Sequence, residues 1–216
     1  MPIINFFKAV GVVAVPLLIF SVVSVALIAE RMLFWFRVNR RQRRVVRETL
    51  RIYRQDQVKA INYLQQNADL PIAKIFLEAL ELDDPNPEEL RIALESAAQA
   101  ELPALKRFNS IFDTIVGISP LLGLLGTILG LMSAFSSLRV GDIGGTNTAG
   151  VTGGISEALA STAMGLVVAI FTLFFANMFR AFYQRQLALI QEYAGQLELL
   201  YRRKYEKGRD VYAASR

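Results

Sequence analysis

The sequence predicts an all-α integral membrane protein with three transmembrane helices, the second and third of which extend as long helices into a helical cytoplasmic region. Three runs carry no charged residue: Ala9 to Ala29, Thr114 to Leu138 and Ala158 to Phe179, of 21, 25 and 22 residues. Each run exceeds the roughly 18 apolar residues that indicate a helix able to cross a bilayer. The hydrophobic content of 53% and the mean hydropathy of +0.36 agree with this fold class.

The first run is interpreted as a retained helix, because Glu30 and Arg31 follow it in place of a small-residue cleavage site. Nine arginines lie between residues 31 and 54, and seven Lys or Arg residues between 180 and 209, whereas 139–157 holds one arginine. The positive-inside rule then predicts a topology with both basic segments in the cytoplasm. The expected segments are an external N-terminus 1–8, a first span 9–33, a cytoplasmic helical region 34–113, a second span 114–138, an external (periplasmic) loop 139–157, a third span 158–179 and a cytoplasmic helical tail 180–216. Because topology explains the arginines at 40–47, we expect no nucleic-acid binding.

The cytoplasmic segments lack the alternation typical of strands and are expected to be helical. A helix is predicted over 37–66, a short one over 72–81, and another beginning at Pro87, where a proline and two glutamates suit a first turn. No glycine follows until Gly117, so this helix is predicted to continue into the second span, and the third span to continue to about Glu206. The Gly- and Thr-rich 139–157 loop is expected to be irregular.

Two spans carry stripes of small residues. In the third span these recur every third or fourth position, which places them on one helix face: Ala158, Thr162, Gly165, Ala169, Thr172 and Ala176. The second span has a related series, Gly123, Thr127, Gly130 and Ala134, with Pro120 and Gly126 in the same glycine-rich stretch. Two interpretations stay open: tight helix packing, or the lining of a cavity formed by several copies, with Thr127 and Thr162 as its polar groups.

The residues that are missing restrict the chemistry. The chain has no Cys and no His, which excludes disulfides and thiol catalysis and removes the commonest metal ligand. We therefore expect no enzyme activity, no metal and no cofactor. None of the three spans contains an Asp, Glu, Lys or Arg, so a proton crossing here needs a titrating group from another chain. Glu157, at the outer mouth of the third span, is the one nearby acid; its alternative role is that of an acid at a helix N-terminus.

Two motifs resemble those of a known family: Gly-Leu-Leu-Gly-Thr-Ile-Leu-Gly at 123–130, and Ile-Ser-Glu-Ala-Leu-Ala-Ser-Thr-Ala-Met-Gly-Leu at 155–166. With Glu30-Arg31 closing the first span, they are similar to the MotA/TolQ/ExbB proton-channel family over nearly the whole chain. Three spans favour the ExbB and TolQ branch over MotA, which has four. The tail beyond about Tyr205 carries no motif of this kind.

The resemblance implies an inner-membrane homopentamer, in contact with lipid, around a single-span ExbD- or TolR-like dimer that supplies the proton-carrying Asp. It also implies roles for individual residues in the proton pathway: Thr127, Thr162, Glu157 and Asn177. Thr172 is expected in the same pathway because it lies on the small-residue stripe of the third span. The residues expected in helix packing are Gly123, Gly126, Gly130, Gly165, Ala158, Ala169 and Pro120. The expected function is an ExbB-like subunit that uses the proton motive force to energise TonB-dependent transport across an outer membrane. The alternatives are a TolQ-like role in envelope integrity and cell division, and a non-conducting membrane scaffold; cargo, ion and copy number stay open.

Overall fold

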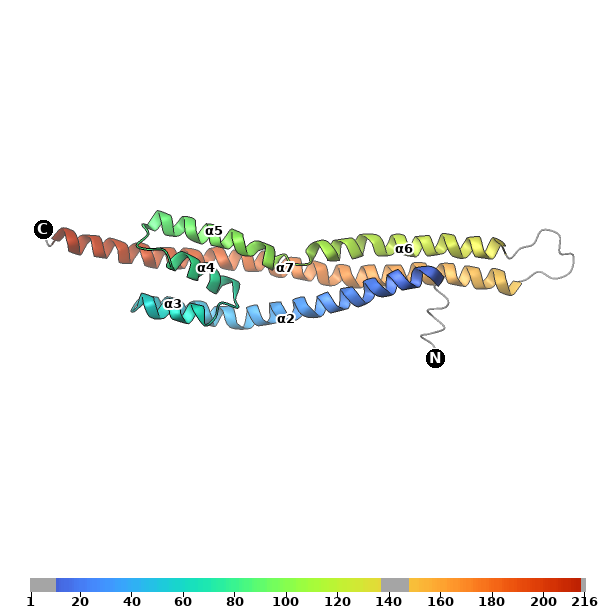
Figure 1. Cartoon of the computed structure of the whole chain (residues 1–216), viewed down its shortest axis with the longest axis horizontal. Helices are drawn as coiled ribbons and strands as arrows, with labels where there is room; N and C mark the ends of the chain where they lie inside the picture. Colours follow the sequence, from blue (N-terminus) through green and yellow to red (C-terminus); the bar gives the residue numbers. More distant parts are fainter. Residues whose placement is uncertain (1–10, 137–147, 215–216) are drawn as a thin grey trace. The chain divides into compact units, whose positions relative to one another are not determined.

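The computed structural model describes residues 11–136 and 148–214, and every element in these ranges is helical (Figure 1). The elements in chain order are η1 Gly11–Val13, α2 Ala14–Tyr53, α3 Gln57–Gln65, α4 Pro71–Leu80, α5 Pro87–Leu105, α6 Asn109–Ser136 and α7 Thr148–Ala214. Three helical stretches of the described chain are long and apolar enough to cross a membrane. The predicted all-α class with three spans is therefore confirmed.

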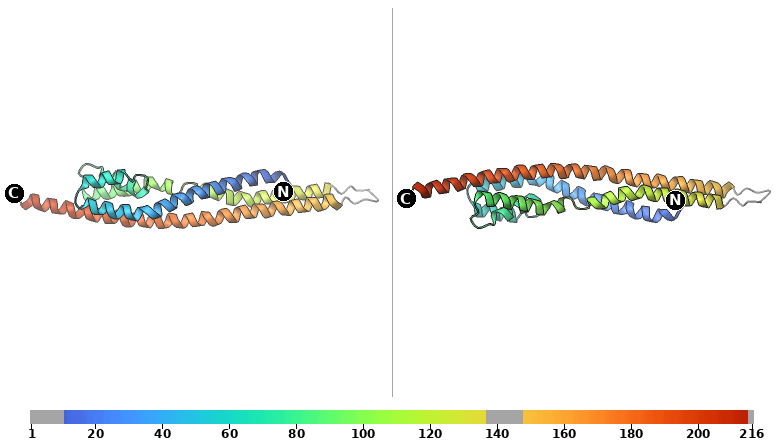
Figure 2. Two further views of the ribbon diagram at one scale, coloured as in Figure 1. Left: turned by 90° about the horizontal axis from the view of Figure 1, so that it is seen from below. Right: turned by 90° about the horizontal axis from the view of Figure 1, so that it is seen from above.

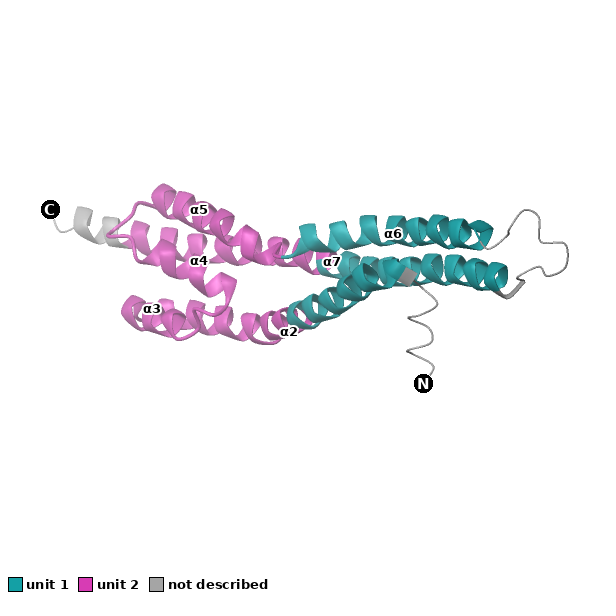
Figure 3. Cartoon of the chain, turned by 45° about the vertical axis from the view of Figure 1, so that its right-hand side comes forward, with its two compact units in different colours: residues 1–31, 108–179 teal, residues 32–107, 180–216 magenta. Residues whose placement is uncertain are grey.

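The chain divides into two compact units (Figure 3). Unit 1 comprises residues 1–31 and 108–179, and unit 2 comprises residues 32–107 and 180–216. The helices α2 and α7 contribute residues to both units. Unit 1 thus contains the apolar parts of all three candidate spans, and unit 2 contains most of the charged residues.

In unit 1, α6 and the first part of α7 lie side by side, as the views in Figures 1 and 2 agree. The rings of Phe112 and Phe179 approach each other at 5.8 Å between centroids, and both side chains are buried. The outward faces carry large apolar side chains that a single chain leaves exposed: Leu121, Leu124, Ile128, Met132, Leu159, Ile170 and Phe174. Such faces suit hydrocarbon or a neighbouring membrane helix.

In unit 2, α3, α4 and α5 pack with the polar parts of α2 and α7. Apolar residues of α4 form much of the core, namely Ile72, Ala73, Ile75, Phe76 and Ala79. The Tyr201 hydroxyl of α7 donates a hydrogen bond to the Pro85 carbonyl oxygen at 2.5 Å. Gln186 likewise donates to Gln42 in a buried contact of 2.5 Å between α7 and α2.

Side-chain caps define where the short helices of unit 2 begin. The Asp56 carboxylate accepts a hydrogen bond from the Lys59 backbone N–H at 3.1 Å, and this bond lowers the pKa of Asp56. Asn86 and Glu89 form a capping box: the Asn86 side chain accepts from the Glu89 N–H at 3.0 Å, and the Glu89 carboxylate accepts from the Asn86 N–H at 2.7 Å. The predicted helix start at Pro87 is confirmed.

We expect Asn86→Ala to destabilise the first turn of α5 by about 1 kcal/mol, because it removes the acceptor for two backbone N–H groups. Amide hydrogen exchange at residues 88–90 of the purified protein should then accelerate about five-fold. Asn62→Ala is the matched control, since the exposed Asn62 lies inside α3, where alanine is the better helix former. Equal exchange in wild type and Asn86→Ala would contradict this role for the cap.

The prediction of one helix from Pro87 into the second span is wrong. Helix α5 ends at Leu105 and α6 begins at Asn109, with Phe108 between them at a φ of 68°. Two local features explain the break. Pro103 lies in the last turn of α5, where its ring removes a helical N–H donor, and the left-handed conformation of Phe108 stops helix propagation.

Two further expectations need correction. Residues 148–157 were expected to belong to an irregular loop, but they form the start of α7; residues 139–147 of that loop lie outside the described chain. Gly154 of this segment serves helix packing, because a Cβ on it would lie 2.7 Å from the Gly130 carbonyl oxygen of α6. The helix predicted over 37–66 is interrupted after Tyr53, where Asp56 caps a new helix.

Candidate functional site

The small-residue stripes of α6 and α7 lie against each other in unit 1. A Cβ on Gly130 would lie 2.8 Å from the Ala158 nitrogen, and one on Gly123 would lie 3.0 Å from the Thr162 Cα. The first distance is shorter than a Cβ tolerates and the second is at the tight limit of Cβ contacts, so the two backbones approach more closely at these glycines than larger residues allow. Ala169 is buried farther along α7. Five of the seven residues predicted for helix packing are brought together here: Gly123, Gly126, Gly130, Ala158 and Gly165.

A cluster of hydroxyl groups lies at the centre of this contact. The Thr127 and Thr162 hydroxyls are hydrogen-bonded to each other, and either can be the donor. Thr127 also lies 3.2 Å from the Ala158 carbonyl oxygen, and Thr162 lies 3.1 Å from the Gly123 carbonyl oxygen. The Ser161 hydroxyl reaches the same two carbonyl oxygens, at 2.8 Å and 3.2 Å. We call Thr127, Thr162 and Ser161 the hydroxyl cluster.

The members of the hydroxyl cluster differ in exposure. Ser161 is fully buried, whereas Thr127 and Thr162 are half-buried and keep an accessible edge. A threonine hydroxyl both donates and accepts, so the bonded pair can exchange donor and acceptor roles without moving a helix. The cluster can therefore present a donor to a carboxylate or an acceptor to a carboxylic acid, but it has no group that itself titrates near neutral pH.

Three other candidate residues lie apart from the hydroxyl cluster. Thr172 is fully buried, where its hydroxyl lies 2.7 Å from the Ser24 hydroxyl of α2 and donates to the Val168 carbonyl oxygen at 2.8 Å. Asn177 is exposed in the described chain, and Pro120 is half-buried within α6. The Thr172 side chain thus contacts α2 and lacks the accessible edge that Thr127 and Thr162 keep.

Glu157 is half-buried and directly precedes Ala158. The alternative interpretation, an acid at a helix N-terminus, is wrong, because α7 begins at Thr148 and has no acid in its first turn. Glu157 is therefore an interior residue of a long helix, five positions before Thr162. At 1.5 Å per residue the two are about 7.5 Å apart along the helix axis.

Sequence reasoning missed Ser161, Gly154 and Ser119 of the contact between α6 and α7, and Ser24 of α2, which bonds to Thr172. Ser161 and Gly154 continue the buried face of α7 through Ala158 and Gly165, and a Cβ on Gly165 would meet the Ser119 carbonyl oxygen at 2.5 Å. The spacing 154, 158, 161, 165 is itself a three-to-four repeat, and it was detectable beside the series that contains Thr162. The one sequence signal for Ser24 is that it places a hydroxyl within the first apolar run, and this does not predict its contact with Thr172. Within the part of the chain that the structure describes, no group of three or more His, Cys, Asp and Glu residues lies together.

Comparison with known proteins adds independent information about the same segment. A family model described as the MotA/TolQ/ExbB proton channel family matches residues 67–192, which include the hydroxyl cluster and Glu157. A Synechocystis protein named ExbB-like 3 is 61% identical over 95% of this chain and 99% of its own length. A second Synechocystis protein, named ExbB-like 1, is 37% identical over 89% of this chain and 76% of its own length. The biopolymer transport protein ExbB of Salmonella typhimurium is 36% identical over 52% of this chain and 46% of its own length.

Proposed function

Because the chain belongs to the MotA/TolQ/ExbB proton channel family, we propose that it is an ExbB-like channel and stator subunit of a proton-driven inner-membrane motor. As a family member with three candidate spans, it is a multi-pass membrane protein that acts in transport and not as an enzyme. Its proposed task is to energise biopolymer transport across an outer membrane through an ExbD-like partner and a TonB-like protein. The proposed orientation has the N-terminus outside and the C-terminus in the cytoplasm, in accordance with the positive-inside rule.

The observation that carries the proposal is the hydroxyl cluster in spans that contain no charged residue. A proton cannot be stored on threonine near neutral pH, so the titrating carboxyl group comes from the partner's transmembrane helix. When that carboxyl is protonated, it donates a hydrogen bond to a threonine hydroxyl oxygen. When it has released its proton, the carboxylate accepts a hydrogen bond from the same hydroxyl.

This exchange lowers the cost of both states of the partner's carboxyl group within the membrane. A hydrogen bond to a charged group contributes roughly 1.5–3 kcal/mol, which offsets part of the cost of an ion in hydrocarbon. The bonded Thr127–Thr162 pair supports the proposal, because one hydroxyl can turn toward the partner while the other keeps a carbonyl acceptor. Alternate protonation would then move the partner helices within a ring of identical subunits.

The two ends of the proposed path are Glu157 and Asn177, with Glu157 on the outer side. Asn177 follows Thr162 by 15 residues on α7, or about 22 Å along the helix axis, so the three positions extend across most of a bilayer core of about 30 Å. Thr172 is assigned a structural role in this proposal, because its hydroxyl is already paired with Ser24. The expected assembly is a homopentamer around a partner dimer, in which the exposed apolar faces of α6 and α7 contact lipid and neighbouring copies.

The proposal is tested by purifying the chain with its native partners and weighing the intact complex by native mass spectrometry. We expect five copies of this chain with two copies of a single-span partner whose span contains an Asp. A TolR-like partner would favour the alternative of envelope integrity and division. A partner without an acid in its span, or no partner at all, would support a non-conducting scaffold and overturn the proposed channel.

A further inference from the structure

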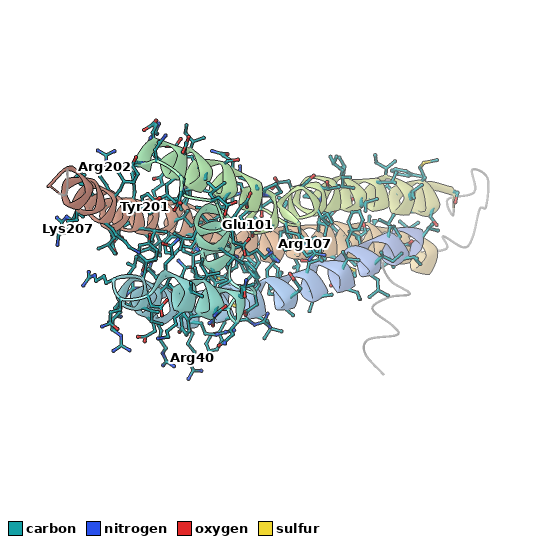
Figure 4. The ribbon with its side chains drawn as sticks, turned by 60° about the vertical axis from the view of Figure 1, so that its left-hand side comes forward. Arg40, Glu101, Arg107, Tyr201, Arg202 and Lys207 are labelled. Carbon is teal, nitrogen blue, oxygen red and sulfur yellow. The ribbon has the colours of Figure 1, made fainter. Side chains whose placement is uncertain are left out.

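A basic groove lies in unit 2, between the C-terminal end of α2 and the polar part of α7. One hollow of about 490 Å³ is lined by Tyr53, Arg54, Leu200, Arg203, Lys204, Glu206 and Lys207. A second hollow of about 660 Å³ is lined by Arg44, Arg47, Glu48, Leu50, Arg51, Arg54 and Gln196. Arg54 lines both, so we treat the two hollows as one basic groove. Lys207, which lines the first hollow, is labelled on α7 in Figure 4.

Positive charge in the basic groove is only partly compensated. Its lining includes seven Arg or Lys residues and two carboxylates, those of Glu48 and Glu206. Arg51 pairs with Glu48 at 2.5 Å, and Lys204 donates to the Gln57 side chain at 3.5 Å. The other cationic residues of the lining form no ion pair with the side chains that the structure describes: Arg44, Arg47, Arg54, Arg203 and Lys207. Like charges gathered in one hollow repel one another, so a bound anion would lower the electrostatic energy.

Tyr53 is a second and independent indication of a ligand. Its side chain is 1% exposed, it lines the groove, and its hydroxyl has no hydrogen-bond partner among the described residues. A buried hydroxyl without a partner is uncommon and costs free energy. Burial, assisted by nearby Tyr201, raises the pKa of the Tyr53 phenol above its usual range, so at neutral pH the group remains an O–H donor. An anionic oxygen is the acceptor that this donor lacks.

A lipid headgroup does not account for the basic groove. Tyr53 follows Leu33, the last residue of the predicted first span, by 20 residues on the same helix. That separation is about 30 Å along the helix axis. Attraction to an anionic membrane surface fades within a Debye length of about 8 Å at physiological salt. At the Tyr53 end of the groove, the occupant is therefore a soluble anion.

We propose that the basic groove binds a small, multiply charged phosphate compound of the polyphosphate or nucleoside polyphosphate class. Guanidinium groups match phosphate oxygens in paired hydrogen bonds, and the groove offers them from Arg54 and Arg203 with ammonium groups beside them. Hollows of this size fall within the roughly 300–1,000 Å³ range of small-molecule sites. The Tyr53 ring and Leu200 supply apolar wall beside the charges.

The test is isothermal titration of the full chain, purified with its native partners, with sodium tripolyphosphate and separately with ATP at physiological salt. We expect saturable binding of tripolyphosphate, and at least ten-fold weaker binding in the double variant Arg54→Gln/Arg203→Gln. Both arginines are exposed, so the variant should fold. The control Arg37→Gln/Arg40→Gln removes the same charge from exposed positions of α2 outside the groove, with Arg40 labelled in Figure 4, and should bind within two-fold of wild type.

Two further titrations identify which groups of the protein and of the ligand take part in binding. Tyr53→Phe keeps the ring and should weaken tripolyphosphate binding about five-fold by removing one hydrogen-bond donor. ATP binding tighter than tripolyphosphate would assign the site to nucleotides, and the reverse order to polyphosphate. The proposal is overturned by binding that does not saturate, by equal losses in the groove and control variants, or by an oligoglutamate peptide that binds as tightly as tripolyphosphate.

Discussion

Replacing Thr162 with valine is expected to reduce proton flux through the complex at least ten-fold while the complex still assembles. Valine keeps nearly the same volume but removes the hydroxyl that bonds to Thr127 and lies 3.1 Å from the Gly123 carbonyl oxygen. The loss of one hydrogen bond to a charged carboxylate, about 1.5–3 kcal/mol, corresponds to roughly ten- to hundred-fold in rate. Flux is measured with a pH-sensitive dye in liposomes that contain the chain and its partner.

Thr114→Val is the matched control for this experiment. Thr114 lies on the same helix as Thr127, but it is exposed and its hydroxyl donates only to the Ser110 carbonyl oxygen of its own helix, at 2.9 Å. We expect flux in this control within two-fold of wild type, and recovery of flux in Thr162→Ser, which restores a hydroxyl. Intact assembly is checked by native mass spectrometry. Flux in Thr162→Val equal to that of the control would exclude the hydroxyl from the proton path.

Replacing Gly165 with alanine is expected to destabilise the contact between α6 and α7 by about 1–3 kcal/mol. The added Cβ would meet the Ser119 carbonyl oxygen at 2.5 Å and the Gly123 Cα at 3.1 Å, and both are backbone atoms that cannot turn aside. The helices must separate, which weakens the packing of small residues that joins them. Circular dichroism during titration with sodium dodecyl sulfate should show unfolding at lower detergent fraction than in wild type.

Gly153→Ala is the control for the packing experiment, since it lies on the same helix and a Cβ there has no atom within 4 Å. Alanine is favoured over glycine in a helix by about 1 kcal/mol, so this variant should be as stable as wild type or slightly more stable. Destabilisation of similar size in both variants would show that the effect comes from the helix itself and not from the contact with α6.

The spans could be predicted because the signal for them is local. Whether a segment of about 20 residues prefers hydrocarbon depends mainly on its own side chains, and three uncharged runs meet that condition without reference to the rest of the chain. The start of α5 was predictable for the same reason, since Asn86, Pro87 and Glu89 form a cap from neighbouring residues.

The break between α5 and α6 was not predicted, although Pro103 lies in the last turn of α5. A proline in a helix can kink it or end it, and the sequence does not say which. Here the helix ends, because Phe108 adopts the left-handed backbone conformation, which phenylalanine seldom adopts and which a sequence pattern therefore does not predict. The interruption after Tyr53 was missed in a similar way. Its cap by Asp56 is a common motif, but other Asp residues of the described chain, such as Asp69 and Asp113, cap no helix.

The sequence did not show which face of α7 is buried against α6. Ser161 and Thr162 are adjacent and both small, and on a helix they differ in direction by about 100°. Only contact with α6 selects between them: Ser161 is fully buried against Gly126, while Thr162 keeps an accessible edge. The direction of the Thr172 hydroxyl could not be predicted either, because its partner is Ser24, which lies far away in the sequence.

Charge and hydropathy along the chain were thus enough to predict an all-helical membrane protein whose spans lack a titrating group, since both are properties of each segment alone. The motifs were also sufficient to indicate the family. Which small residues serve packing and which hydroxyls stay accessible depend on the helix lying opposite, so these could be read only from the folded chain. The fold likewise selects which arginines gather around Tyr53, since they come from segments about 150 residues apart in the chain.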